Sequence, residues 1–145
     1  MKLIILLLAG LFTLQSTAKA DEDRAISVEQ LPSKAQQFIK QYFPKNEIAL
    51  AKVEKDFWDR KYEVVFVNGE KAEFSKNGTW EKIDCKYSAV PEALIPSAIL
   101  EYIRKHYDNV KVLKIEKDSK TWEIRLNNRV ELEFNHAFQL IDIDI

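Results

Sequence analysis

Six short segments of the chain occur twice in the same order, and this internal duplication limits the possible folds more than any other feature. Leu31-Pro32-Ser33 recurs 64 residues later as Ile95-Pro96-Ser97, and the spacing of later pairs falls in steps of two to 58. Such a decrease is expected if the second copy has shorter turns. The other pairs are Phe38-Ile39-Lys40 with Tyr102-Ile103-Arg104, Val53-Glu54-Lys55-Asp56 with Ile115-Glu116-Lys117-Asp118, Tyr62-Glu63-Val64 with Trp122-Glu123-Ile124, Glu73-Phe74 with Glu133-Phe134, and Trp80 and Ile83-Asp84 with Phe138 and Ile141-Asp142. Matched segments in a fixed order indicate one structural unit that is present twice.

Each copy begins with a helical pattern. Apolar and aromatic residues occur with the spacing i, i+3, i+4, i+7 that marks one face of a helix; they are Ala35, Phe38, Ile39 and Tyr42. Pro32 suits the first turn because its missing N–H would have no partner there, and Pro44 ends the helix. In the second copy Pro96 opens the helix, and the equivalent positions are Ile99, Tyr102, Ile103 and His106.

The segments after each helix have the period of two that is typical of half-buried strands. Val130, Leu132 and Phe134, for example, alternate with Glu131 and Glu133. Each copy contains four such segments. Strands this short, joined by tight turns, are expected to pair antiparallel, because parallel pairing would need long crossover connections.

The turns between these strands carry their own signals. Asn68-Gly69 indicates a tight hairpin, and Asn77-Gly78 marks the next turn. In the second copy we expect Asn127-Asn128 and Asn135-His136 to form the corresponding turns, because Asn tolerates a positive φ better than most residues.

These patterns predict an α+β fold made of two tandem repeats. Each repeat would consist of one helix and a four-stranded antiparallel sheet, with the helices packed on one face. We place the first repeat at residues 26–84 and the second at residues 90–145, joined by Cys85-Lys86-Tyr87-Ser88-Ala89. This link is short, so the copies should form one compact unit, sharing a core or continuing one sheet.

The first twenty residues are predicted to be a signal peptide. The apolar run from residue 3 to residue 14 follows a single basic residue, Lys2, and Ala18 and Ala20 form a small-x-small cleavage pattern. A run of that length is shorter than the roughly 20 residues of a spanning helix. Cleavage after Ala20 would leave a periplasmic protein with no stable membrane anchor, although secretion beyond the envelope stays open. Asp21-Glu22-Asp23 would then be a disordered N-terminus.

Composition excludes several classes of function. The 145 residues carry a net charge of −1, which gives no basic surface for nucleic acid. One Cys and two His are too few for an intramolecular disulfide or a zinc cage, and three Gly are too few for a glycine-rich phosphate loop.

The few reactive side chains have simple structural explanations. Cys85 lies in the link between the repeats, where a structural thiol is a better interpretation than a nucleophile paired with a histidine. We expect His106 to be half-buried between helix and sheet and His136 to be solvated in a turn. Asp142 and Asp144 share one face of the last strand, which is better explained as a solvated face than as a calcium site. We therefore predict no catalytic residues, no cofactor and no metal site.

The polar faces of the strands are the best candidate for a binding surface. Acidic residues gather on the face opposite the helices, and Trp58 lies in the first hairpin loop, where an exposed Trp could anchor a partner. A charged face that only keeps the protein soluble is the alternative. The candidate partner-binding residues are Trp58, Glu63, Glu73, Glu123, Arg125, Glu131 and Glu133, joined on the same face by Lys52, Glu54, Lys114 and Glu116.

The duplicated pattern resembles the β-lactamase-inhibitor-like, PepSY-like family of exported bacterial proteins. The residues that carry this resemblance are Leu31-Pro32, Phe38-Ile39, Tyr42-Phe43-Pro44, Tyr62-Glu63-Val64, Asn68-Gly69, Glu73-Phe74, Trp80 and Ile83-Asp84, with their counterparts in the second copy. The resemblance implies helices packed on a sheet that can continue through both halves, and it implies no defined activity.

Together these observations predict an exported, non-enzymatic binding protein. It would bind an envelope protein or peptide partner through the open sheet face, with inhibition of an enzyme as one form of this function. The alternative is a small-ligand carrier or envelope sensor with a pocket between helix and sheet.

Overall fold

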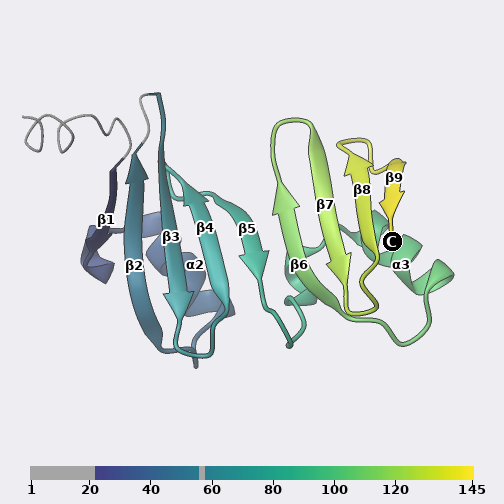
Figure 1. Ribbon diagram of the computed structural model, residues 1–145, viewed down its shortest axis with the longest axis horizontal. Helices are drawn as coiled ribbons and strands as arrows, with labels where there is room; N and C mark the ends of the chain where they lie inside the picture. Colours follow the sequence, from purple (N-terminus) through teal and green to yellow (C-terminus); the bar gives the residue numbers. More distant parts are fainter. Residues whose placement is uncertain (1–21, 56–57) are drawn as a thin grey trace, which may run out of the picture.

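A single antiparallel sheet is the main element of the computed structural model, which describes residues 22–55 and 58–145. Within these residues the sheet has nine strands, each paired with its neighbours in the sequence (Figure 1). The strands are β1 Glu22–Ile26, β2 Ile48–Lys55, β3 Arg60–Phe66, β4 Lys71–Ser75, β5 Trp80–Asp84, β6 Val112–Lys117, β7 Thr121–Leu126, β8 Glu131–Asn135 and β9 Leu140–Asp144.

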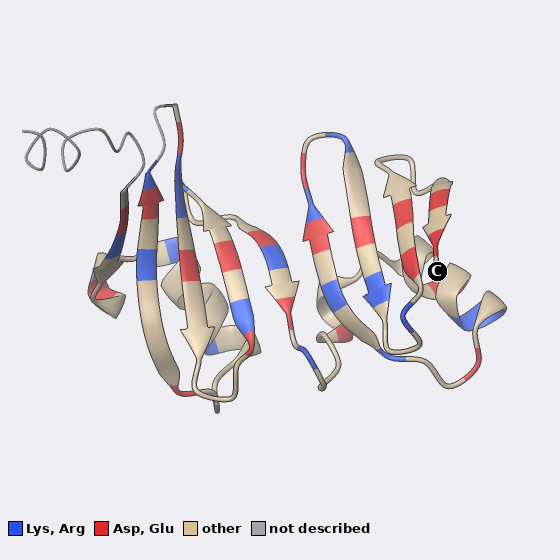
Figure 2. Cartoon of the chain, in the orientation of Figure 1, with Lys and Arg blue, Asp and Glu red and all other residues tan. Residues whose placement is uncertain are grey.

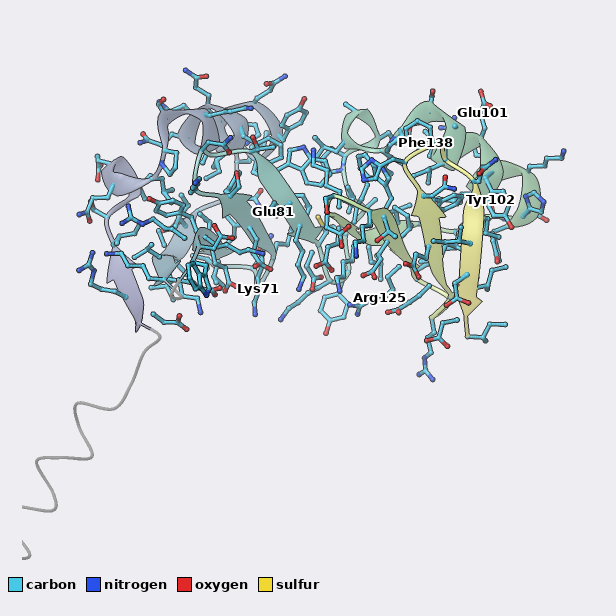
Figure 3. The ribbon with its side chains drawn as sticks, turned by 90° about the horizontal axis from the view of Figure 1, so that it is seen from above. Lys71, Glu81, Glu101, Tyr102, Arg125 and Phe138 are labelled. Atoms are coloured by element: carbon cyan, nitrogen blue, oxygen red, sulfur yellow. The ribbon has the colours of Figure 1, made fainter. Side chains whose placement is uncertain are left out.

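Two α-helices, α2 (Ser33–Tyr42) and α3 (Ser97–His106), cover one face of this sheet. Both begin directly after a proline, where the periodicity predicts them. Helix α2 buries Ala35 and Ile39, and helix α3 buries Ile99 and Ile103. Two short 3-10 helices, Val28–Gln30 and Glu92–Leu94, precede them. Figure 3 shows Tyr102 on the helix side and Lys71 and Arg125 on the other side, which we call the open face.

The predicted fold of two repeats, each with its own four-stranded sheet, is wrong. The nine strands form one sheet, so the described chain is mostly β structure with a few helices. The two halves join where β5 pairs with β6 through Lys82↔Glu116, Ile83↔Ile115 and Asp84↔Lys114. A separate four-stranded sheet would leave unpaired N–H and C=O groups at this edge, and pairing the two edges satisfies them.

The N-terminal strand is a second difference from the prediction. Glu22 and Asp23, which we expected to be disordered, belong to β1, which pairs with β2 from Glu22↔Lys55 to Ile26↔Ala51. Asp21 and the predicted signal peptide lie outside the described residues. An antiparallel neighbour supplies the hydrogen bonds that this polar segment cannot obtain from local structure.

The core lies between the sheet and the two helices. Phe43 stacks on Phe66 at a centroid distance of 5.2 Å. Phe38 meets Phe74 edge to face, and Tyr102 meets Phe134 in the same way, each at a centroid distance of 5.5 Å. Each fully buried side chain of this size contributes roughly 1.5–3 kcal/mol. The strand residues that are almost completely buried are Val64, Phe66, Ala72, Phe74, Ile83, Ile115, Ile124, Leu126, Leu132 and Phe134.

The ladders show which residues of the two halves occupy equivalent positions. Glu63 pairs with Glu73 in β3 and β4, and Glu123 pairs with Glu133 in β7 and β8, a spacing of 60 residues. The same spacing continues into β5 and β9, because both hairpins contain one irregularity at the same place. The predicted decrease to 58 is therefore wrong. Trp80 corresponds to Leu140 rather than Phe138, and Ile83-Asp84 corresponds to Ile143-Asp144 rather than Ile141-Asp142.

The strand before each of these hairpins is related by a different spacing. Lys52 pairs with Glu63, and Glu116 pairs with Glu123, so Lys52 and Glu116 are equivalent at a spacing of 64. The predicted match of Glu54 with Glu116 is therefore wrong. The spacing changes once, by four residues, because β2 and its hairpin loop are longer than β6 and its loop.

The turns of the second half reach a positive φ without glycine. Gly69 and Gly78 have φ of +91° and +87°, and the equivalent residues Arg129 and Phe138 have φ of +73° and +61°. The prediction that Asn residues would adopt this conformation is wrong. Their side chains instead accept backbone N–H groups: Asn128 Oδ1 from Val130 at 3.1 Å and Asn135 Oδ1 from Ala137 at 3.0 Å.

Candidate functional site

A row of charged side chains crosses the open face, one from each of the strands β2 to β9. In the first half the row is Lys52, Glu63, Glu73 and Lys82, which are direct neighbours in the ladders. The Nζ atom of Lys52 lies 4.0 Å from a Glu63 oxygen, and that of Lys82 lies 3.5 Å from a Glu73 oxygen. Two cations thus flank two carboxylates, and this part of the row is electrically balanced.

In the second half the same row contains only acids. Glu116, Glu123, Glu133 and Asp142 are ladder neighbours from β6 to β9, and we call them the carboxylate row. Figure 2 shows Asp or Glu on each of these four strands. Like charges directly opposite each other in a sheet repel, so this arrangement works against folding unless a cation offsets it.

Comparison of equivalent positions shows where the imbalance arises. The two glutamates in the middle are common to both halves, whereas Lys52 is replaced by Glu116 and Lys82 by Asp142. Two exchanges of a cation for an acid therefore turn a neutral row into one with four negative charges. Sequence reasoning placed Glu116 on this face but explained Asp142 as part of a solvated strand, because cross-strand neighbours cannot be read from periodicity.

The environment of Glu123 reflects this crowding. Burial raises the pKa of its carboxyl group, and the neighbouring Glu116 and Glu133 carboxylates raise it further, while Lys114 acts in the opposite direction. Lys114 Nζ lies 3.7 Å from a Glu116 oxygen. The charged form of Glu123 is therefore disfavoured, and a cation brought near it would stabilise that charged form.

A shallow pocket of about 230 Å³ opens beside the carboxylate row. Arg125 and Glu131 both line it, with Arg125 Nε 3.5 Å from a Glu131 carboxylate oxygen, and both side chains are substantially exposed. The charged residues that line it are five acids and two bases, so the pocket has an acidic character. They are Lys114, Glu123, Arg125, Glu131, Glu133, Asp142 and Asp144.

The structure separates the predicted partner-binding residues into four groups. Glu63 and Glu73 belong to the balanced half of the row, and Glu123 and Glu133 to the carboxylate row. Arg125 and Glu131 lie beside that row as an ion pair. Trp58, 89% exposed, lies in the loop between β2 and β3, at the other end of the sheet from the pocket (Figure 1).

Cys85 has the environment of a structural thiol. It is 2% exposed, and burial followed by the nearby Glu70 carboxylate raises its pKa to about 12. Such a thiol is almost entirely protonated at neutral pH, and the protonated form is a poor nucleophile.

The two histidines are both exposed and bound to backbone carbonyls. His106 stacks on Tyr102 at 4.1 Å and contacts its carbonyl oxygen through Nδ1 at 2.9 Å. The prediction of a half-buried His106 is therefore wrong, because the helix ends there and its last turn extends past the sheet. His136, predicted to be solvated, is exposed and contacts the Asp118 carbonyl oxygen at 2.7 Å.

A second pocket, of about 290 Å³, lies between α3 and the start of β6. Val90, Ile95 and Ile103 contribute apolar walls. At its rim Arg104 Nη2 contacts both carboxylate oxygens of Glu92 at 3.1 Å. Helix and sheet thus flank a partly open space that has both apolar walls and charged residues.

Comparison with solved structures shows proteins of the same fold. A protein from Bacteroides thetaiotaomicron, provisionally described as calcium-regulated and periplasmic, is 54% identical, with a TM-score of 0.83 over 85% of this chain and 97% of its own. A periplasmic protein of the DUF2874 family from Bacteroides vulgatus is 49% identical, with a TM-score of 0.84 over 88% of this chain and 100% of its own. A third protein, from Bacteroides vulgatus and of unknown function, is 32% identical, with a TM-score of 0.81 over 86% of this chain and 100% of its own. No curated protein matches the chain.

The sequence comparison agrees with these structures. The pattern of the family described as beta-lactamase-inhibitor-like, PepSY-like matches residues 60–142, which run from β3 to β9 across both halves of the sheet. The neighbours in structure are described as periplasmic, and no helix in the described part of this chain is long and apolar enough to cross a bilayer. The chain belongs to the beta-lactamase-inhibitor-like, PepSY-like family.

Proposed function

We propose that the chain is a periplasmic binding protein, exported by cleavage after Ala20, and that it catalyses no reaction. It binds a basic protein or peptide partner through the open face of β6 to β9. The observation that carries this proposal is the carboxylate row, in which four acids replace the balanced pattern of the first half. Inhibition of an envelope enzyme would be one consequence of such binding.

Electrostatic complementarity supports a basic partner. The repulsion between the carboxylates is a cost that the free protein carries, and a Lys or Arg side chain placed beside the row would relieve it. The acidic pocket beside the row offers room for such a side chain. Surface charge also steers association and makes it depend on salt.

The chain itself supplies a matched control for the test. Glu123→Gln with Glu133→Gln changes the carboxylate row, and Glu63→Gln with Glu73→Gln changes the equivalent positions of the balanced half. Fluorescein-labelled octalysine is titrated against each protein at low salt. The first pair should weaken binding by about fivefold or more, since exposed ion pairs contribute up to about 1 kcal/mol each. Equal effects of the two pairs, or no binding to the unchanged protein, would contradict the proposal.

One relative is described as calcium-regulated, which raises the question of whether the carboxylate row could hold calcium. No group of three or more His, Cys, Asp or Glu side chains in the described part of the chain is arranged to hold a metal ion. The carboxylate row extends across four strands that are about 4.8 Å apart, whereas calcium ligands converge to about 2.4 Å from the ion. These residues do not fit a preformed calcium site, and the proposal contains no calcium-binding step.

The pocket beneath α3 favours a second candidate function, a carrier or sensor of a small apolar ligand. Its volume of about 290 Å³ lies near the lower limit for ligand pockets, and Arg104 at the rim suits an anionic head group. Octanoate is the probe, measured by calorimetry. Leu100→Trp, which adds volume at the pocket wall, should abolish binding, and Leu50→Trp on β2 should not. Absence of octanoate binding to the unchanged protein would eliminate this candidate.

A further inference from the structure

Strand β9 is an edge of the sheet with an unoccupied hydrogen-bonding side. It pairs with β8 through Glu131↔Asp144, Leu132↔Ile143 and Glu133↔Asp142, and no other strand of the described chain adjoins it. In Figure 1 it is the outermost strand at one side of the sheet. Native proteins often protect such edges with charged residues or Pro, and β9 contains no Lys or Pro but two acids, Asp142 and Asp144, so an added strand would meet negative charge.

Exposed apolar side chains concentrate at this edge. Of the nine large hydrophobic residues that are exposed in the described chain, four lie between residues 138 and 145. They are Phe138, Ile141, Ile143 and Ile145, with exposed fractions of 39%, 52%, 43% and 95%. Such a concentration is typical of a surface that another molecule covers.

Phe138 adds a conformational observation. It has a φ of +61°, which bulky side chains rarely adopt, and it occupies the position that glycine holds in the first half. Its ring lies 6.2 Å from Trp122 on the helix side (Figure 3). An aromatic side chain is thus held beside β9 in spite of an unfavourable backbone.

The two faces of β9 differ in chemistry. Ile143 lies opposite the buried Leu132, on the helix side, whereas Asp142 and Asp144 lie opposite Glu133 and Glu131 on the open face. A strand added beside β9 would alternate in the same way. Its residues on the open face would adjoin carboxylates, and those on the helix side would adjoin exposed isoleucine.

We propose that β9 accepts an extended segment of the partner as a tenth strand, and that this segment alternates basic with apolar residues. Strand addition to a free edge is an established mode of peptide recognition: the backbone supplies affinity and alternate side chains supply specificity. The inference rests on the proposed function and deepens it, because it specifies the form of the partner.

A second copy of the chain is a poorer occupant of this edge. Antiparallel pairing of two β9 strands would place Asp142 and Asp144 of one copy beside those of the other, and like charges opposite each other are unfavourable. Pairing of β9 with β1 of another copy would be head-to-tail and would continue into open chains of molecules. Charge complementarity instead favours a separate basic segment.

Backbone methylation of a peptide tests the proposal on the full chain. The probe is labelled acetyl-Lys-Val-Lys-Val-Lys-amide, with one version N-methylated at both valines and another at the second and third lysines. Only alternate N–H groups of an added strand point toward the sheet. One methylated version should therefore lose about tenfold or more in affinity, and the other should bind like the parent. Equal affinities of all three would overturn strand addition.

Octalysine binding distinguishes docking on the open face from strand addition at β9. If octalysine binding depends on Glu123 and Glu133 but the methylated peptides all bind equally, docking on the open face stands and strand addition fails. If neither octalysine nor the parent peptide binds, both proposals fail.

A substitution in β9 gives an independent test. Ile143→Thr keeps a β-branched residue that suits a strand but removes apolar surface, so it should weaken binding of the alternating peptide several-fold and leave octalysine binding unchanged. Val67→Thr, at an exposed site outside the edge, is the control and should change neither. A dimer in light scattering that Ile143→Thr converts to monomer would overturn the proposal, because a second copy would then occupy the edge.

Discussion

Glu123 and Glu63 are the same residue type at equivalent ladder positions, yet their surroundings are opposite. Glu63 lies between Lys52 and Glu73, whereas Glu123 lies between Glu116 and Glu133. Burial alone would lower the pKa of Lys52, but the Glu63, Glu54 and Asp23 carboxylates outweigh it and raise this pKa. At the residue scale, the neighbour across the ladder decides whether a carboxylate stabilises the sheet.

Neutralising Glu123 should therefore stabilise the protein. We expect Glu123→Gln to raise the free energy of unfolding at pH 7 by roughly 0.2–1 kcal/mol, the size of cross-strand side-chain interactions in general. A raised pKa of an acid means that the penalty is fully present above the folded-state pKa. It disappears below the ordinary Glu value of 4.5, where both states are protonated.

Urea unfolding at pH 7 and pH 3.5 measures this difference. The control, Glu63→Gln, removes a carboxylate that contacts Lys52 and should be neutral or destabilising at pH 7. A gain for Glu123→Gln that persists unchanged at pH 3.5 would show that charge repulsion is not its cause.

At the element scale, the turn that precedes β5 fixes the position of α2. A Cβ atom on Gly78 would lie 2.9 Å from Pro32 Cβ and 3.0 Å from the Ala35 backbone nitrogen, so this turn packs directly on the first turn of the helix. The equivalent contact at Gly69 is with the Lys86 Nζ atom at 3.3 Å, the end of a flexible side chain. Both glycines have positive φ, but only one of them touches a rigid element.

The two glycines should therefore respond differently to the same substitution. Gly69→Ala should cost about 1 kcal/mol, from the positive φ alone. Gly78→Ala should cost roughly 2–4 kcal/mol, because the added methyl group must also displace the start of α2. Urea denaturation monitored by circular dichroism gives both values. Equal costs would mean that the start of α2 can shift to accommodate the methyl group without loss of stability.

At the scale of the whole molecule, the two halves meet across a narrow seam. The β5–β6 ladder contains three residue pairs, and beyond it Cys85 N donates to Leu113 O and Val90 N to Val112 O, both at 2.8 Å. On the helix side Trp80 meets Trp122 at 6.2 Å, and Lys117 Nζ lies 4.0 Å from the Trp80 ring centre. Burial, followed by the nearby Lys34, lowers the pKa of Lys117.

Trp80 should consequently stabilise the whole chain. It joins Phe38 of the first half to Trp122 and Lys117 of the second, and we expect Trp80→Ala to cost roughly 2–4 kcal/mol, somewhat below a fully buried Trp. The control is Tyr87→Ala, at an aromatic residue that is 89% exposed, which should change stability by no more than about 0.5 kcal/mol.

The transition itself is informative. The unchanged protein should unfold in one step, with coincident fluorescence and circular dichroism curves, if the seam couples the halves. Two separate steps would show that the halves unfold independently.

Much of the secondary structure could be predicted from local patterns. Helical spacing after Pro32 and Pro96 located both helices, because amphipathic periodicity and proline act within a few residues. Alternation also placed Glu63, Glu73, Glu123 and Glu133 on the face away from the helices, where their ladder positions lie. Their role in binding stays a prediction.

The sequence by itself thus determined both helices, eight of the nine strands and the two faces of those strands, since these depend on the period of each segment alone. The tertiary structure decided that the nine strands form one sheet, that Lys52 corresponds to Glu116, and that Asp142 completes the carboxylate row. Such facts depend on strand register, which hydrogen bonds between distant segments set and which no local pattern contains. The candidate site exists only once that register places its four acids side by side.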